Sequence, residues 1–388
     1  MREKLQFYRP AAAAFLTMMA MSLTSSTRSF FLEPVCESLE INRGSFSVIF
    51  SLLAVSGAIT QPFLGQYAGR RGVRGILLLS GVWVCGSMLL LAAAKQLWVL
   101  YLSGFLMGAF STNCAAFCAS VMVQQSYAPE RAAGIQGIVM AGSGVGGMLF
   151  SFLIPGCIRA LGWEAGACVM GVSWLALHFA AAVLLGEEIR RSGKSTAAGM
   201  DGMTRKEALK SPELYLLMGI IIVITACCGI QQQLPSLLAD FGYSGERVSV
   251  MISFMTAALA VGKIIQGQLY GRAGLKTGGC VMLLLFALGF FAMLRRELAW
   301  PGLVLLAFGM GIYTTMMPLV VRKIFGSREY PEIWALIATV GSVGTFAANP
   351  IWGTIFDVTG SYRIGLLIAP VLLTGAIIAL RWALGKIR

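Results

Sequence analysis

Residues 61–74 read QPFLGQYAGRRGVR, and residues 263–276 read KIIQGQLYGRAGLK. Five positions of the first stretch recur in the second, at an offset of 267 − 65 = 202 residues: Gly65, Gln66, Gly69, Arg70 and Gly72 return as Gly267, Gln268, Gly271, Arg272 and Gly274. Each copy follows one apolar run and leads into another, as a tight turn between two membrane helices does. A repeat at about half of the 388-residue length predicts two similar halves.

The composition is that of a membrane protein. The chain is 57% hydrophobic and 12% charged, with a mean hydropathy of +0.78, whereas a soluble domain has roughly 25% charged residues. At about 20 apolar residues per spanning helix, the first half has runs at 11–32, 46–67, 75–94, 97–122, 132–156 and 165–186, and the second at 212–238, 248–270, 277–294, 299–321, 333–356 and 364–383. The prediction is therefore an all-α membrane protein with twelve transmembrane helices.

These runs predict two pseudo-symmetric six-helix halves, residues 1–186 and 211–388, joined by a polar linker at 187–210 that we expect to be cytoplasmic. Continuous apolar runs favour helices over a β-barrel, whose strands alternate in pieces of about ten residues. The first run is too long for a cleaved signal peptide and should remain as the first helix. Residues 203–210, MTRKEALK, are typical of a short amphipathic helix on the membrane surface.

The charge distribution predicts the orientation. Of 30 Lys and Arg residues, 21 lie in segments on the side of the termini, seven in loops on the other side and two within spans, since 21 + 7 + 2 = 30. By the positive-inside rule both termini are cytoplasmic, and we expect a multi-pass protein of the plasma membrane. The net charge of +13 follows this anchoring pattern, so no nucleic-acid partner is expected.

Short loops leave no room for an extramembrane catalytic domain, and the spans have no Asp or Glu away from their ends. The single histidine, His178, has no acidic residue in its own or neighbouring turns and is interpreted as a satisfied core residue. The nine cysteines lack metal-site spacing with His or carboxylates. We therefore expect no enzymatic activity, cofactor or metal, and a protein that works as a monomer.

Two full charges lie well inside predicted spans, Arg28 in the first helix and Lys263 in the eighth. The repeat offset places Gln61 opposite Lys263, because 263 − 202 = 61, and places Arg28 opposite residue 230, next to Gln231. Four long polar side chains at related positions predict a substrate site at the interface of two repeats, and the two positive charges favour an anion such as a carboxylate. The alternative is that each cation only snorkels towards a headgroup layer.

Other polar and small residues give weaker signals. Asn113, Tyr313, Asn349 and Trp352 lie in predicted spans and are candidate substrate contacts. Each could instead hydrogen-bond a neighbouring helix. Glycines three or four residues apart let helices approach closely, and this packing role is predicted for Gly142, Gly146, Gly341 and Gly344.

The repeated loop resembles the loop between helices two and three of the major facilitator superfamily. That resemblance implies its fold and a loop that latches the inward-closed state, although Gly69 and Gly271 replace the family's usual aspartate. A narrower similarity is to the oxalate/formate antiporter and monocarboxylate transporter branch, in residues 30–52, 203–217 and 324–363.

In that branch a basic residue four positions before the loop glycine of helix eight contacts the substrate carboxylate, and Lys263 stands there. Leu259 stands where monocarboxylate carriers place an aspartate, which favours exchange or facilitated diffusion over proton symport. The sequence thus predicts a secondary active or facilitative transporter of a small mono- or dicarboxylate. Alternatives are a carrier of a neutral or amphipathic solute, as in drug efflux, and a membrane sensor that transports nothing.

Overall fold

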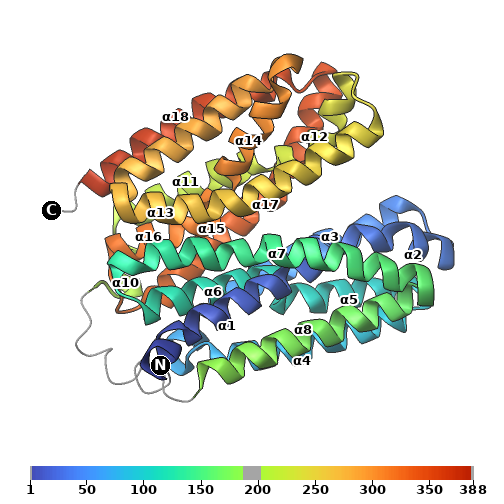
Figure 1. The fold of residues 1–388 in the computed structure, drawn as a ribbon, viewed down its shortest axis with the longest axis horizontal. Helices are drawn as coiled ribbons and strands as arrows, with labels where there is room; N and C mark the ends of the chain where they lie inside the picture. The colour runs from blue at the N-terminus through green and yellow to red at the C-terminus, as the bar shows by residue number, and fades with distance from the viewer. Residues whose placement is uncertain (1, 187–201, 386–388) are drawn as a thin grey trace. The chain divides into compact units, whose positions relative to one another are not determined.

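The computed structural model describes residues 2–186 and 202–385, and the elements named within them are all helices (Figure 1). Ten helical segments of this described part are long and apolar enough to span a membrane. One of them, α13 (Gly245–Ala292), joins two runs at Gly274, whose φ of 78° and ψ of 160° are not helical. Counting its two runs separately gives 10 + 1 = 11 spans, and α1 (Arg2–Ser25), a 24-residue helix that is not among the ten segments, precedes them. The predicted all-α membrane fold class is confirmed.

The residues form two compact units that follow the two halves except in two short segments. Unit 1 contains residues 1–126, 139–201 and 328–339, and unit 2 contains residues 127–138, 202–327 and 340–388. Hydrogen bonds attach the first of these segments, residues 127–138, to the rest of unit 2. Arg322 donates to the Tyr127 carbonyl at 2.8 Å, and Gln136 donates to the Thr314 carbonyl at 3.0 Å. The N-terminal parts of α7 (Pro129–Leu161) and α17 (Tyr330–Thr359) therefore belong to a different unit from the rest of each helix.

Unit 1 is built from α1 and the helices that follow it. These are η1 (Arg28–Phe31), α2 (Leu32–Ser38), α3 (Arg43–Arg71), α4 (Arg74–Ala92), α5 (Leu97–Phe110), α6 (Thr112–Ser126), α7 (Pro129–Leu161) and α8 (Trp163–Leu185). The ends of α3 show why it begins and stops where it does. Asn42 accepts a hydrogen bond from the Ser45 amide at 2.7 Å, and Gly72 ends the helix with φ 77°.

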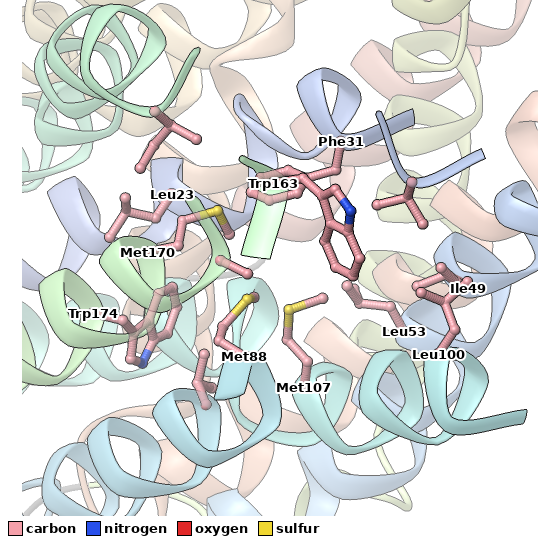
Figure 2. Close-up of a cluster of buried hydrophobic side chains, with 14 of the residues drawn as sticks. Leu23, Phe31, Ile49, Leu53, Met88, Leu100, Met107, Trp163, Met170 and Trp174 are labelled. Carbon is pink, nitrogen blue, oxygen red and sulfur yellow. The ribbon is translucent and has the colours of Figure 1, made fainter. Parts of the chain in front are cut away.

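The core of unit 1 is an apolar cluster that draws on α1, α3, α4, α5 and α8. Figure 2 shows Met88 and Met107 between Trp174 on one side and Leu53 on the other. Met88, Trp174 and Leu23 are each at most 1% exposed. Methionine side chains fill irregular gaps between helices because they are unbranched and flexible.

The fourth span of unit 1 is broken between α5 and α6 at Ser111, which has φ −92° and ψ −120°. The end of a helix leaves its last four carbonyl groups without helical partners, and two neighbouring helices supply donors to two of those in α5. Ser80 of α4 donates to the Phe110 carbonyl at 2.7 Å, and Thr60 of α3 donates to the Ala109 carbonyl at 2.8 Å. Trp174 in turn donates to the Ser80 hydroxyl at 3.2 Å.

Unit 2 is built in a similar way from the helices of the second half. Its elements are α10 (Arg205–Ala208), α11 (Pro212–Cys228), α12 (Ile230–Asp240), α13, η2 (Arg296–Leu298), α14 (Ala299–Met310), α15 (Ile312–Thr315), α16 (Met317–Phe325), α17 (Tyr330–Thr359) and α18 (Arg363–Gly385). The helix expected in residues 203–210 is α10. Thr204 and Glu207 form a reciprocal capping box at its N-terminus. Most of the predicted linker, residues 187–201, lies outside the described residues.

The breaks within spans differ from the uninterrupted helices that the sequence predicts. The first span was expected at 11–32, but α1 covers Arg2–Ser25, and Arg28 lies in η1 beyond its end. Ser22 and Thr24 donate to carbonyls three residues earlier, a side-chain bond that competes with helical hydrogen bonding. The placement of Arg28 within a continuous first helix was therefore wrong.

Candidate functional site

The repeated loop glycines are positions of close helix approach. A Cβ on Gly65 of α3 would overlap Ala335 of α17 and lie 2.9 Å from the Pro331 carbonyl. A Cβ on Gly267 of α13 would lie 2.6 Å from the Ala133 carbonyl of α7. Because 133 + 202 = 335, the two contacts are equivalent. Glycine at these positions allows α3 to meet α17 within unit 1, and α13 to meet α7 within unit 2.

The remaining residues of the loop motif face outward or set the turn. Arg70 and Arg272 are exposed. Gly72 and Gly274 have φ values of 77° and 78°, a backbone region that side-chain-bearing residues rarely adopt. The two copies of the turn therefore share one backbone geometry.

Gly69 is a position where the resemblance leads one to expect an aspartate, and its surroundings disfavour one. A Cβ on Gly69 would lie 3.3 Å from Glu332 Oε1, in the first turn of α17. We expect Gly69→Asp to lower stability by about 1 kcal/mol, because it brings two carboxylates together near the surface. The melting temperature of the purified variant measures this.

A second substitution checks the cause. The effect of Glu332→Gln on the melting temperature is compared in the wild-type and Gly69→Asp backgrounds. In the Gly69→Asp background, Glu332→Gln should lower the melting temperature less than it does alone, or should raise it back towards the wild-type value. Equal effects in both backgrounds would show that the two carboxylates do not repel each other.

Lys263 lies on α13 in unit 2, and its side chain is buried. It is 7% exposed, and its carbonyl faces Gly137 of α7, whose Cβ would lie 2.5 Å away. Gln266, one turn further on and fully buried, donates to the Phe308 carbonyl and accepts from Thr315. Lys263 and Gln266 are thus buried polar side chains three residues apart on α13, and Gln266 connects α13 to α14 and α15.

Gln61 occupies the equivalent position on α3 in unit 1. It is 2% exposed, and its Oε1 accepts no hydrogen bond from any residue that the structure describes. Asn113 of α6 lies against α3 one turn before Gln61, since a Cβ on Gly57 would be 2.9 Å from Asn113 Nδ2. The hydroxyls of Thr24 and Thr112 lie 3.0 Å apart. Unit 1 therefore also has a polar group where α3 meets the broken fourth span.

Three other predicted substrate contacts, Arg28, Gln231 and Asn349, are placed differently. The side chains of Arg28 and Asn349 lie outside the described residues. Gln231 is exposed on α12. Gln233, on the same helix, accepts a hydrogen bond from Tyr362 at 3.0 Å, and burial raises the pKa of Tyr362, which follows α17. Gln233 thus has a structural partner, whereas Gln231 is accessible.

Trp352 and Tyr313 both pack against glycines of unit 2. Trp352 is 4% exposed, donates to the Ala226 carbonyl at 2.9 Å and stacks on Phe290 with ring centroids 6.0 Å apart. Tyr313 is half-buried against Gly341, whose Cβ would lie 3.0 Å from its ring. The only polar atom of the Trp352 side chain is therefore used to hold α17 against α11.

The glycines predicted to pack helices lie at close contacts. A Cβ on Gly142 would be 2.8 Å from the Phe15 carbonyl, and one on Gly146 would be 2.5 Å from the Met19 carbonyl, so α7 packs on α1. In unit 2, Gly341 faces Ile221 and Gly344 faces Thr225, so α17 packs on α11.

Sequence reasoning missed two buried glutamines, Gln136 and Gln266, which are both fully buried. A signal for Gln266 was present, because it follows Lys263 by three residues on the same helix face.

His178 is buried as expected, but only its Nδ1 has a partner, the Trp174 carbonyl at 3.1 Å. Its Nε2 has none among the described residues. Within the same described part, no group of three His, Cys, Asp or Glu side chains is placed to hold a metal.

The family profile of the Major Facilitator Superfamily matches residues 11–349. The chain is 23% identical over 330 residues to the uncharacterized MFS-type transporter YhjX of Escherichia coli (strain K12), covering 82% of this chain and 81% of that protein. It is 24% identical over 364 residues to Monocarboxylate transporter 13 of Rattus norvegicus, covering 92% and 84%. In fold it is similar to the proton:xylose symporter XylE, with a TM-score of 0.78, 10% identity and coverage of 97% and 95%.

Proposed function

Because the chain belongs to the Major Facilitator Superfamily, we propose that it carries a small organic carboxylate by alternating access, with Lys263 as the charge that the substrate contacts. The observation that carries this proposal is the burial of Lys263, 7% exposed in the apolar α13. A cation at membrane depth costs about 2.5–3.5 kcal/mol on insertion scales. A carboxylate that binds there gains a charge-assisted hydrogen bond and helps to offset that cost.

The relatives give independent support for the substrate class. The rat protein that matches 92% of this chain is named a monocarboxylate transporter. The basic residue of that branch also falls on Lys263 by resemblance. Lysine presents three donors from a single nitrogen, so it binds a carboxylate without the planar fork of arginine. Substrates that need two parallel hydrogen bonds should therefore have no particular advantage.

The proposed mode of transport is exchange or facilitated diffusion. Leu259, one turn before Lys263, carries no titratable group. A proton-coupled carrier of this branch would have an aspartate there, by the resemblance described above. Substrate binding itself then drives the change between the two states, because a ligand shifts an equilibrium only through its different affinities for them.

The remaining predicted contacts are proposed with different roles. Gln61 and Asn113 are proposed as hydrogen-bonding contacts, because Gln61 Oε1 is buried without a partner in the described part of the chain. Gln231 is proposed because it is exposed on α12. Arg28, Tyr313, Asn349 and Trp352 stay in the proposed set and are to be tested singly.

A ligand panel tests the substrate class. The purified protein is heated with small mono- and dicarboxylates, and with the matching amides as neutral controls. A carboxylate at about 100 times its dissociation constant should stabilise the protein by roughly 2.7 kcal/mol, and its amide should not. Stabilisation by amides or amphipathic amines, without any by carboxylates, would favour the neutral-solute alternative and end the present proposal.

A further inference from the structure

A cavity of about 410 Å³ opens in unit 2 where α12 meets α13 and where α14 begins. Met251, which is fully buried, contributes to its lining. Tyr243 and Trp300 contribute aromatic rings, and Glu246 and Arg247 contribute opposite charges. None of these residues belongs to the proposed carboxylate contacts, so the cavity calls for a separate explanation.

The aromatic lining is held in place by neighbours. Tyr243 donates to the Arg296 carbonyl at 3.1 Å, and the Arg296 guanidinium lies 5.2 Å from the centre of its ring. Trp300 packs edge-on against Phe254, with ring centroids 5.5 Å apart. Side chains fixed in this way lose little freedom when a ligand binds.

Polar and apolar surfaces meet at this cavity. Glu246 and Arg247 are exposed in the first turn of α13. One further turn along the helix, Val250 is 56% exposed and also lines the cavity. Trp300 is 43% exposed at the start of α14. A tryptophan beside charged side chains at the end of a spanning helix is typical of the headgroup level of a bilayer.

An apolar stripe leads away from the cavity along α13. Phe254, Val261 and Ile265 follow Val250 at helical spacing and are between 42% and 54% exposed. The α13 span is 28% buried in its most apolar window, the lowest share among the spans found in the described residues. The stripe is therefore suited to contact with acyl chains.

We propose that this cavity binds the headgroup of a zwitterionic phospholipid, with an acyl chain lying along the apolar stripe. Arg247 contacts the phosphate and Glu246 contacts the ammonium group, which also lies against the exposed ring of Trp300. The pair of opposite charges distinguishes this ligand from an anionic lipid, which has no ammonium group for Glu246. The proposal does not rest on the identity of the transported substrate.

Lipid retention by the delipidated full-length protein in detergent tests the proposal. Dioleoyl phosphatidylethanolamine is added, and binding is followed by native mass spectrometry and by melting temperature. Dioleoyl phosphatidylglycerol and free phosphoethanolamine are the comparison ligands. The ethanolamine lipid should bind at least about tenfold more tightly than either, since each comparison ligand lacks the ammonium group or the acyl chains.

Matched variants locate the site. Glu246→Gln and Arg247→Gln should each weaken binding of the ethanolamine lipid by about tenfold. Glu297→Gln and Arg363→Gln remove exposed charges outside the cavity lining and should leave it unchanged. Equal binding of the two lipids, or unchanged binding in both lining variants, would overturn the proposal. Equal binding of free phosphoethanolamine would instead show a soluble-ligand site and also overturn it.

Discussion

Lys263→Gln is expected to reduce carboxylate transport in proteoliposomes by at least roughly 30-fold. Removing one partner of a buried charge pair costs about 2–5 kcal/mol, and each 1.4 kcal/mol is a factor of ten. Glutamine is the substitution of choice because Gln61 already occupies the equivalent position in the other repeat, 2% exposed. The fold therefore accommodates that side chain, and a loss of transport is not expected to come from unfolding.

Two control variants sharpen this result. Lys263→Arg keeps the charge and should retain most of the transport activity. Lys276→Gln removes an exposed lysine of the same element and should have no effect. If Lys263→Gln melts at the wild-type temperature and transports carboxylate at the wild-type rate, Lys263 is not a substrate contact, and a neutral solute becomes the better hypothesis.

Gly267→Ala is expected to lower both stability and transport. The added Cβ would lie 2.6 Å from the Ala133 carbonyl and 2.8 Å from Gly137 Cα. Both are backbone atoms of α7, which can give way only if the two helices separate. Forcing extra volume into such a contact costs about 1–3 kcal/mol.

Gly271→Ala is the matched control, because its Cβ would meet only Ala133 Cβ at 3.9 Å. Alanine is favoured over glycine within a helix by up to about 1 kcal/mol, so this variant should be neutral or slightly more stable. We expect the two variants to differ by about 2 kcal/mol or more in unfolding free energy. Equal melting temperatures would show that α13 and α7 adapt to the extra methyl group.

The sequence predicted the features of the fold that depend on long-range patterns. Apolar runs of bilayer length recur along the chain, and the 202-residue offset matches Gly65 with Gly267. The breaks within spans were not predicted, because they depend on single residues whose alternatives are close in energy. Ser22 and Thr24 bond to the backbone near the end of α1, but hydroxyl groups also occur within continuous membrane helices.

The candidate site was less accessible to sequence reasoning. Lys263 could be singled out because a charge in an apolar run is expensive. Trp352 could not be interpreted in the same way, because an indole N–H can donate to a ligand or to a backbone carbonyl equally well. Here it donates to the Ala226 carbonyl at 2.9 Å. Gln136 gave no signal, since its contact with the Thr314 carbonyl at 3.0 Å joins residues 178 positions apart.

The break at Ser111 does not leave the end of α5 unpaired in the membrane. A carbonyl group that faces hydrocarbon without a donor costs several kcal/mol. In this chain Ser80 of α4 and Thr60 of α3 donate to the carbonyls of Phe110 and Ala109, at 2.7 and 2.8 Å. Side chains of two neighbouring helices thus replace the backbone donors that the next helical turn would have supplied, and a span can be interrupted at this point without exposing these two carbonyls to lipid.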